Sequence, residues 1–117
     1  MNIAIYRIHY GLDFIGKSIK SIIDDIDLIF IFYSNNPWIV QKKMIYKNQE
    51  IDFPNNPENV EKYLFDNFGN NSKIKIINFE CHTPLNQFGI MYEIALENIK
   101  KKPKKVLFIE PDMVFPK

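Results

Sequence analysis

The sequence contains few of the residues that build disulfide-bonded or glycine-rich sites. It has one cysteine, Cys81, and four glycines among 117 residues. A single cysteine excludes an intramolecular disulfide and a zinc site made of several thiolates. With so few glycines, the backbone has little scope to wrap closely around a phosphate by itself. A diphosphate ligand would therefore need a cation.

Long hydrophobic runs and an excess of charge are also missing. No apolar stretch approaches the roughly 18 residues that a membrane span needs. The first residues are expected to form a strand and not a signal sequence. The formal net charge is +1, so no strong basic field is present to attract a nucleic-acid backbone. We expect a cytoplasmic, soluble protein with no membrane span and no nucleic-acid partner.

Three common nucleotide-binding and catalytic motifs are absent. The sequence has no G-x-G-x-x-G after its first strand-like run, no G-x-x-x-x-G-K-[ST] and no G-x-S-x-G. These absences argue against a dinucleotide-binding fingerprint, a P-loop and a hydrolase nucleophile elbow. With 46% hydrophobic and 25% charged residues, the composition is that of one ordinary globular domain spanning residues 1–117.

Strand-like and helix-like patterns alternate along the chain. Four short apolar runs predict strands covered on both faces, namely Ile3–Ile8, Leu28–Tyr33, Ile74–Phe79 and Val106–Ile109. Between them, apolar residues recur at helical spacing in three groups: Ile15 to Ile26, Val60 to Phe68, and Phe88 to Ile99. The alternation predicts an α/β fold, a Rossmann-like three-layer sandwich with a mainly parallel sheet of about four strands.

Particular residues mark the expected helix ends and core. Asp13 is the expected N-cap of the first helix, Pro57 the first residue of the second, and Gly69 its end. Phe88 and Met91 are expected in the core. The connection from about residue 35 to 56 is long enough to suggest a functional or mobile loop.

Polar residues follow each predicted strand. His9 and Tyr10 follow the first strand, Ser34 and Asn35 the second, Glu80 to His82 the third, and Glu110 and Asp112 the fourth. Because ligands of open parallel sheets bind beyond the carboxyl ends of the strands, we expect these sets to line one crevice.

Glu110 and Asp112 form the most distinctive of these sets. Their carboxylates are hard oxygen ligands suited to Mg²⁺ or Mn²⁺, and Pro111 between them fixes the local backbone. The alternative is a strand-end turn whose acids are solvated, or in which Asp112 caps the following segment. His9 and Tyr10 likewise fit either a nucleotide contact or an ordinary polar strand end, and Ser34 and Asn35 are also common turn residues.

Three stretches resemble the nucleotide-sugar glycosyltransferases of the GT-A fold. "NIAIYRIHYGLDFIGKSIKSI" is similar to the first strand and helix of the large inverting family, and "VLFIEPDMVF" looks like its Asp-x-Asp segment. "NQFGIMYEIALENIK" is similar to the helix that precedes that segment. The sequence departs from the family in having Glu110 for the first acid, and no proline or asparagine in the turn Arg7–Tyr10.

The resemblance implies a donor-binding site. Asp112 and Glu110 would bind Mn²⁺ or Mg²⁺, and His9, Tyr10, Ser34 and Asn35 would bind the nucleotide of a nucleotide-diphosphate sugar. The sugar would be transferred to an unknown acceptor. Enzymes of this family continue into an acceptor half that supplies the catalytic base, so we expect a domain incomplete at its C-terminal end, with the catalytic residue unknown.

Two other functions stay open. A sugar-phosphate nucleotidyltransferase would share the fold, but "RIHYGLD" lacks the glycine-rich, arginine-containing loop of those enzymes. A non-catalytic nucleotide-binding or protein-interaction domain would use the same edge without metal.

Trp38 is expected to pack over a sheet edge, and Cys81 and His82 are not expected to form a catalytic pair. The edge beside the fourth strand invites pairing, so the isolated chain is expected to be marginally stable or to self-associate.

Overall fold

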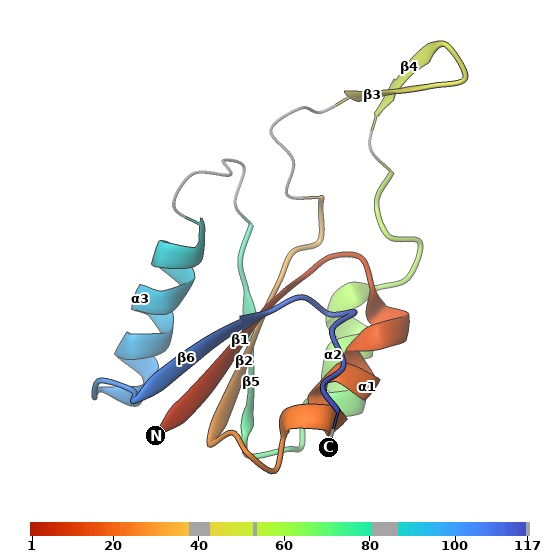
Figure 1. Ribbon diagram of the computed structural model, residues 1–117. Coiled ribbons are helices and arrows are strands. Elements are labelled where there is room, and N and C mark those ends of the chain that lie inside the picture. The colour runs from red at the N-terminus through yellow and green to blue at the C-terminus, as the bar shows by residue number, and fades with distance from the viewer. Residues whose placement is uncertain (38–42, 53, 81–86, 117) are drawn as a thin grey trace.

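The computed structural model describes residues 1–37, 43–52, 54–80 and 87–116 (Figure 1). Its centre is a four-stranded parallel sheet with the strand order β5-β2-β1-β6. The strands are β1 (Asn2–Ile8), β2 (Leu28–Tyr33), β5 (Ile74–Asn78) and β6 (Lys105–Ile109). All four predicted strands are therefore present, and they form the parallel sheet that their hydrophobicity indicated.

Three helices cover the two faces of this sheet. They are α1 (Leu12–Ile22), α2 (Val60–Phe68) and α3 (Gln87–Ile99). Figure 1 shows α1 and α2 on one face and α3 on the other. A hydrophobic core lies on each face of the sheet, and alternate residues of β1 point into one core or the other. Ala4, Tyr6 and Ile8 pack with α1 and α2, whereas Ile3 and Ile5 pack with α3. Burial on both faces explains why the strands are almost continuously hydrophobic and confirms the Rossmann-like three-layer fold.

The strand order reverses between β1 and β6. From β1 the chain moves outward through β2 to β5, and it then returns across the sheet to place β6 on the free side of β1. Parallel crossovers share one hand, so a reversal of direction requires α3 to cover the opposite face from α1 and α2. This reversal marks the gap between the carboxyl ends of β1 and β6 as the topological switch point.

The first two helices begin at other residues than expected. Gly11, not Asp13, is the N-cap of α1, and its φ of 90° is one that glycine adopts without strain. Asp13 lies in the first turn, where its charge complements the helix dipole. The prediction for Pro57 was also wrong, because α2 begins three residues later behind Asn59. Gly69 ends α2 as predicted, and its N–H donates to the Phe65 carbonyl.

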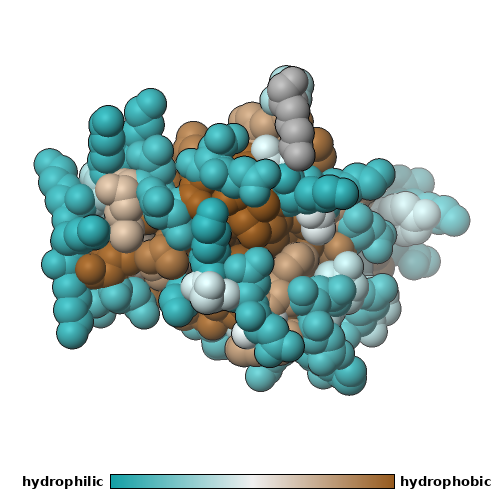
Figure 2. Space-filling model, turned by 90° about the horizontal axis from the view of Figure 1, so that it is seen from below, coloured by the Kyte–Doolittle hydropathy of each residue, from teal (hydrophilic) through white to brown (hydrophobic). Residues whose placement is uncertain are grey.

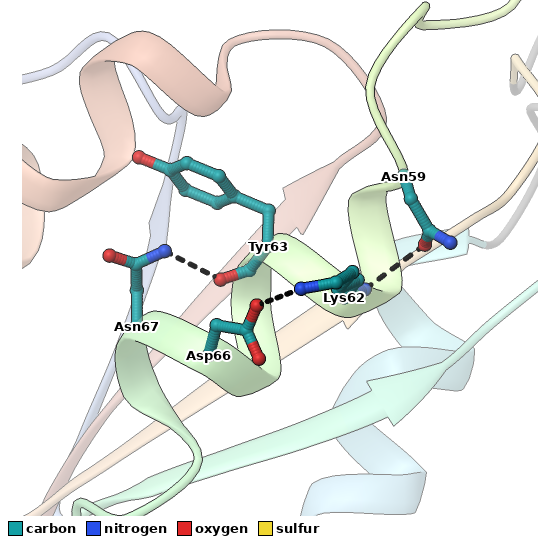
Figure 3. Close-up of polar contacts among 5 residues, drawn as sticks. All are labelled: Asn59, Lys62, Tyr63, Asp66 and Asn67. Carbon is teal, nitrogen blue, oxygen red and sulfur yellow. Dashed lines mark hydrogen bonds and ion pairs between the residues drawn. The ribbon is translucent and has the colours of Figure 1, made fainter.

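The helix begins after Asn59 and not at Pro57, because the Asn59 side chain accepts a hydrogen bond from a backbone N–H in the first turn of α2 (Figure 3). Asn59 Oδ1 accepts from the Lys62 N–H at 3.0 Å. Further along α2, the Lys62 ammonium lies 2.6 Å from the Asp66 carboxylate, and Asn67 Nδ2 donates to the Tyr63 carbonyl at 2.8 Å. These contacts stabilise the exposed face of α2, and the opposite face enters the core.

Phe88 is not the core residue that its helical spacing predicted. Met91 is fully buried, but Phe88 is 45% exposed, because α3 begins near the β6 edge of the sheet. The Phe88 ring packs edge-to-face on Phe108, 5.2 Å between centroids, and the Arg7 guanidinium carbon lies 5.2 Å from its centroid. The polar residue beside it, Gln87, is buried and accepts from Arg7 Nη1 at 2.7 Å.

The long connection after β2 contains a hairpin that the sequence analysis missed. Strands β3 (Lys43–Tyr46) and β4 (Gln49–Asp52) pair antiparallel. Lys47 and Asn48 between them both have positive φ, as a two-residue type I′ turn requires. The hairpin projects beyond the carboxyl edge of the sheet (Figure 1), and the molecule measures 48 × 26 × 26 Å.

Figure 2 views the molecule from the opposite side, where the amino ends of the strands lie. It shows a hydrophobic area largely bordered by hydrophilic side chains. Within the part of the chain that the structure describes, no helix is both long and apolar enough to cross a membrane. The six predicted site residues lie on the other side, at the carboxyl ends of the strands.

Candidate functional site

The turns after β1 and β6 are packed against each other at the switch point. Gly11 approaches Pro111 so closely that a Cβ on Gly11 would lie 3.3 Å from the Pro111 Cβ. Pro111 is buried, whereas Glu110 and Asp112 on either side of it are exposed. The fold thus presents both predicted metal ligands to solvent directly beside the turn that carries His9 and Tyr10.

The two acids belong to a tight turn. The Met113 N–H donates to the Glu110 carbonyl at 3.0 Å, which places Pro111 at the second turn position, where proline is favoured. The chain then runs back along α1, where the Phe115 N–H donates to Ser21 Oγ at 3.1 Å. Both ends of the turn are therefore held, so the two carboxylates are presented from a fixed backbone.

The metal-ligating capacity of this turn is limited to those two acids. Among the described residues, no group of three or more histidines, cysteines, aspartates or glutamates could jointly hold a metal ion. Mg²⁺ sites commonly use only one or two carboxylates and complete the octahedron with waters and substrate phosphates. Glu110 and Asp112 fit that kind of site and not a closed, all-protein one.

His9 is buried and engaged through both ring nitrogens. Nε2 accepts from the Asn56 backbone N–H at 2.9 Å, and Nδ1 lies 2.9 Å from the Ser34 carbonyl. A backbone N–H can only donate, so Nε2 must be unprotonated and the proton must be on Nδ1, donating to Ser34. His9 is therefore held as one neutral tautomer that joins the end of β1 to the turn after β2 and to the segment before α2.

Asn56 completes this connection from the other side. Its Nδ2 donates to the His9 carbonyl at 2.9 Å, and its Oδ1 accepts from the Glu58 N–H at 3.0 Å. In the sequence, residue 56 was singled out only as the approximate end of the long connection. No local pattern identifies its role, because its partner lies 47 residues earlier.

Tyr10 lies at the surface next to His9. Its ring stands edge-on to the His9 ring with 4.6 Å between centroids, and its hydroxyl donates to the Pro54 carbonyl. The side chain is 45% exposed, and its partial burial raises the pKa of the phenol. Tyr10 thus helps to hold the segment before α2 and still offers part of its ring to a ligand.

The turn after β2 is closed by Glu80, a residue that was expected to line the crevice but was given no role there. Glu80 accepts from the Asn35 N–H at 2.8 and 3.0 Å and from Asn36 Nδ2 at 3.2 Å. Ser34 is buried, and its hydroxyl donates to the Asn36 carbonyl. An acid placed directly after the neighbouring strand is the signal that could have identified Glu80. Asn35, Asn36 and Glu80 are all exposed.

The structure therefore brings all six predicted site residues to one edge of the sheet. His9 and Ser34 are buried and hydrogen-bonded within the protein, whereas Tyr10, Asn35, Glu110 and Asp112 are exposed. Their roles toward a nucleotide or a metal stay predictions. The predictions for Trp38, Cys81 and His82 fall outside the described residues.

Comparisons with protein-family models, curated proteins and solved structures found no match for this chain. The resemblance to GT-A glycosyltransferases therefore stays a prediction from the quoted stretches.

Proposed function

We propose that this domain binds a nucleotide-diphosphate sugar at the carboxyl ends of β1 and β6, with Mg²⁺ or Mn²⁺ between protein and diphosphate. One observation carries the proposal: two exposed carboxylates flank a buried proline at the point where the strand order reverses. Ligands of doubly wound sheets bind at that point. Two carboxylates without a neutralising cation would repel a diphosphate, so the metal is part of the proposal.

Asp112 is the principal metal ligand in this proposal, and Glu110 is a second or water-mediated ligand. When bound, the cation would neutralise charge on the departing nucleoside diphosphate as the sugar is transferred to the acceptor, which is Lewis-acid assistance. The chain's own contribution is to present the two acids from a turn whose backbone is held by Pro111 and by the Met113–Glu110 hydrogen bond. This arrangement fits glycosyl transfer to an acceptor of unknown class.

The four predicted nucleotide-binding residues divide into two tasks. The Tyr10 ring and the Asn35 side chain are exposed and would contact the base and ribose. His9 and Ser34 are buried, and they would shape the pocket by holding its turns together. Aromatic stacking accepts any base, so this arrangement predicts weak discrimination between UDP and GDP.

A second candidate is a protein-interaction domain that uses the same fold without metal. The observation in its favour is the projecting β3–β4 hairpin, in which Ile45 is 79% exposed. A two-stranded hairpin with an exposed apolar side chain gains stability when a partner covers it. This candidate predicts no nucleotide binding that depends on metal.

Calorimetry separates the two candidates. UDP and GDP are titrated, with and without Mn²⁺, into the natural chain, Asp112→Asn and Asp24→Asn. Asp24 is also exposed, but it follows α1 at the opposite edge of the sheet, so its substitution controls for the loss of one charge. We expect Mn²⁺-dependent binding that Asp112→Asn abolishes and Asp24→Asn retains. Absence of binding by the folded natural chain would refute the proposal and favour the interaction domain.

A further inference from the structure

The outer edge of β6 is open in the part of the chain that the structure describes. β6 is the last strand of the sheet, with β1 on one side only. Leu107 is 40% exposed and Phe108 is 44% exposed, although adjacent residues of a strand point to opposite faces. Both faces of the sheet are therefore incompletely covered at this edge, as expected if a further strand lies beside β6.

The backbone of β6 shows which groups are available for such a strand. The Lys104 N–H donates to the Met1 carbonyl at 2.7 Å and so points toward β1. Because backbone groups alternate along a strand, those of Lys105, Leu107 and Ile109 point away from β1. An open row of this kind is a template for pairing with another chain.

We propose that β6 pairs antiparallel with β6 of a second copy of this chain, so that the two four-stranded sheets become continuous. A two-fold axis perpendicular to the sheet places Leu107 opposite Leu107 of the other copy, and Lys105 opposite Ile109. In this register each residue with outward backbone groups meets another such residue. Shifting the register by two residues would place Lys105 opposite Pro111, which has no N–H to donate.

The side chains are complementary in the same register. Lys104, just before the strand, lies opposite Glu110 of the other copy, just after it, and symmetry makes this contact twice. These residues form a pair without mutual hydrogen bonds, the kind in which side chains are closest. Val106 lies opposite Phe108, so each half-exposed apolar side chain gains a neighbour. The basic start and acidic end of one strand thus identify an identical, antiparallel strand as its partner.

The inference does not rest on the proposed function. A metal ion and Lys104 of the other copy would compete for the Glu110 carboxylate, so the dimer is tested without nucleotide or metal. Sedimentation equilibrium of the whole chain in a chelating buffer measures the dimer dissociation constant. Lys104→Glu and Glu110→Lys each replace two attractive pairs by two repulsive ones, and the double variant restores attraction with the charges exchanged. The control is Lys105→Glu, which makes the same charge change opposite the uncharged Ile109.

We expect a dimer whose dissociation constant rises about tenfold or more in each single variant at low salt and returns toward the natural value in the double variant. The control should change it by about twofold or less. Circular dichroism verifies that each variant is folded. A natural chain that stays monomeric, or a dimer that is indifferent to both single variants, would overturn the proposal. A dimer that the single variants weaken but the double variant does not restore would overturn the register.

Discussion

Replacing His9 by phenylalanine should destabilise the domain markedly, although the ring and its packing are kept. The substitution removes both ring nitrogens and leaves the Ser34 carbonyl and the Asn56 N–H without their partner. A buried polar group left unsatisfied costs about 1–3 kcal/mol. Ser34 is fully buried and Asn56 half-buried, so we expect about 2 kcal/mol for the first and about 1 kcal/mol for the second. The expected loss is therefore about 3 kcal/mol, within the range that a small domain tolerates while it still folds.

Urea unfolding measures this loss. For a domain of this size, a loss of about 3 kcal/mol lowers the unfolding midpoint by about 1.5 M. Tyr10→Phe is the matched control, because it removes a single hydroxyl bond to Pro54 at an exposed site and should cost less than about 1 kcal/mol. If His9→Phe is no more destabilising than this control, His9 does not join the three segments, and the account of the site's construction is wrong.

Two further predictions concern α1 and β1. Gly11→Ala should destabilise the domain by about 1–2 kcal/mol, because the φ of Gly11 is 90° and the new Cβ would contact Pro111. Gly16→Ala should stabilise the domain by about 0.5–1 kcal/mol, because Gly16 lies within α1 with open space around it. Thermal unfolding compares the two variants. If Gly11→Ala does not destabilise, the positive φ of Gly11 and its close approach to Pro111 are refuted. Burial raises the pKa of the Tyr6 phenol above its ordinary 10.0, although the hydrogen bond with Ser18 lowers it. The folded state favours the neutral phenol, so the stability that Tyr6 contributes is complete below pH 10.0 and is lost as the pH rises through the higher folded-state pKa. Between neutral and alkaline pH, the melting temperature of Tyr6→Phe should therefore fall less than that of the natural chain. An equal loss in both would contradict this assignment.

The fold was predictable because every strand of the sheet is hydrophobic along most of its length. That pattern required cover on both faces and so implied helices in two layers. Phe88 was misassigned because a helical stripe does not reveal where the sheet ends beneath it. The hairpin was missed because its strands have four residues each and its turn is Lys47-Asn48, not the stronger Asn-Gly signal.

The site was predictable only as far as topology determines it. The carboxyl ends of parallel strands meet at one edge, so residues that follow different strands were expected together, and they are together. The partners of His9 were not predictable, because Asn56 reaches it through a loop whose path depends on tertiary packing. Glu80 was expected at these strand ends because it follows a strand, but its hydrogen bond to Asn35, across 45 residues of sequence, was not predictable.

The most direct test of the central claim is to locate bound metal by nuclear magnetic resonance. Amide spectra of the ¹⁵N-labelled chain are recorded as Mn²⁺ is added in the presence of UDP, because signals near the paramagnetic ion broaden first. We predict that the signals of Tyr10, Gly11 and Asp112 are lost first and that Asp112→Asn prevents this. Broadening that begins at Asp24 and Asp25, or that spreads evenly over the surface acids, would contradict a metal-dependent nucleotide site at the ends of β1 and β6.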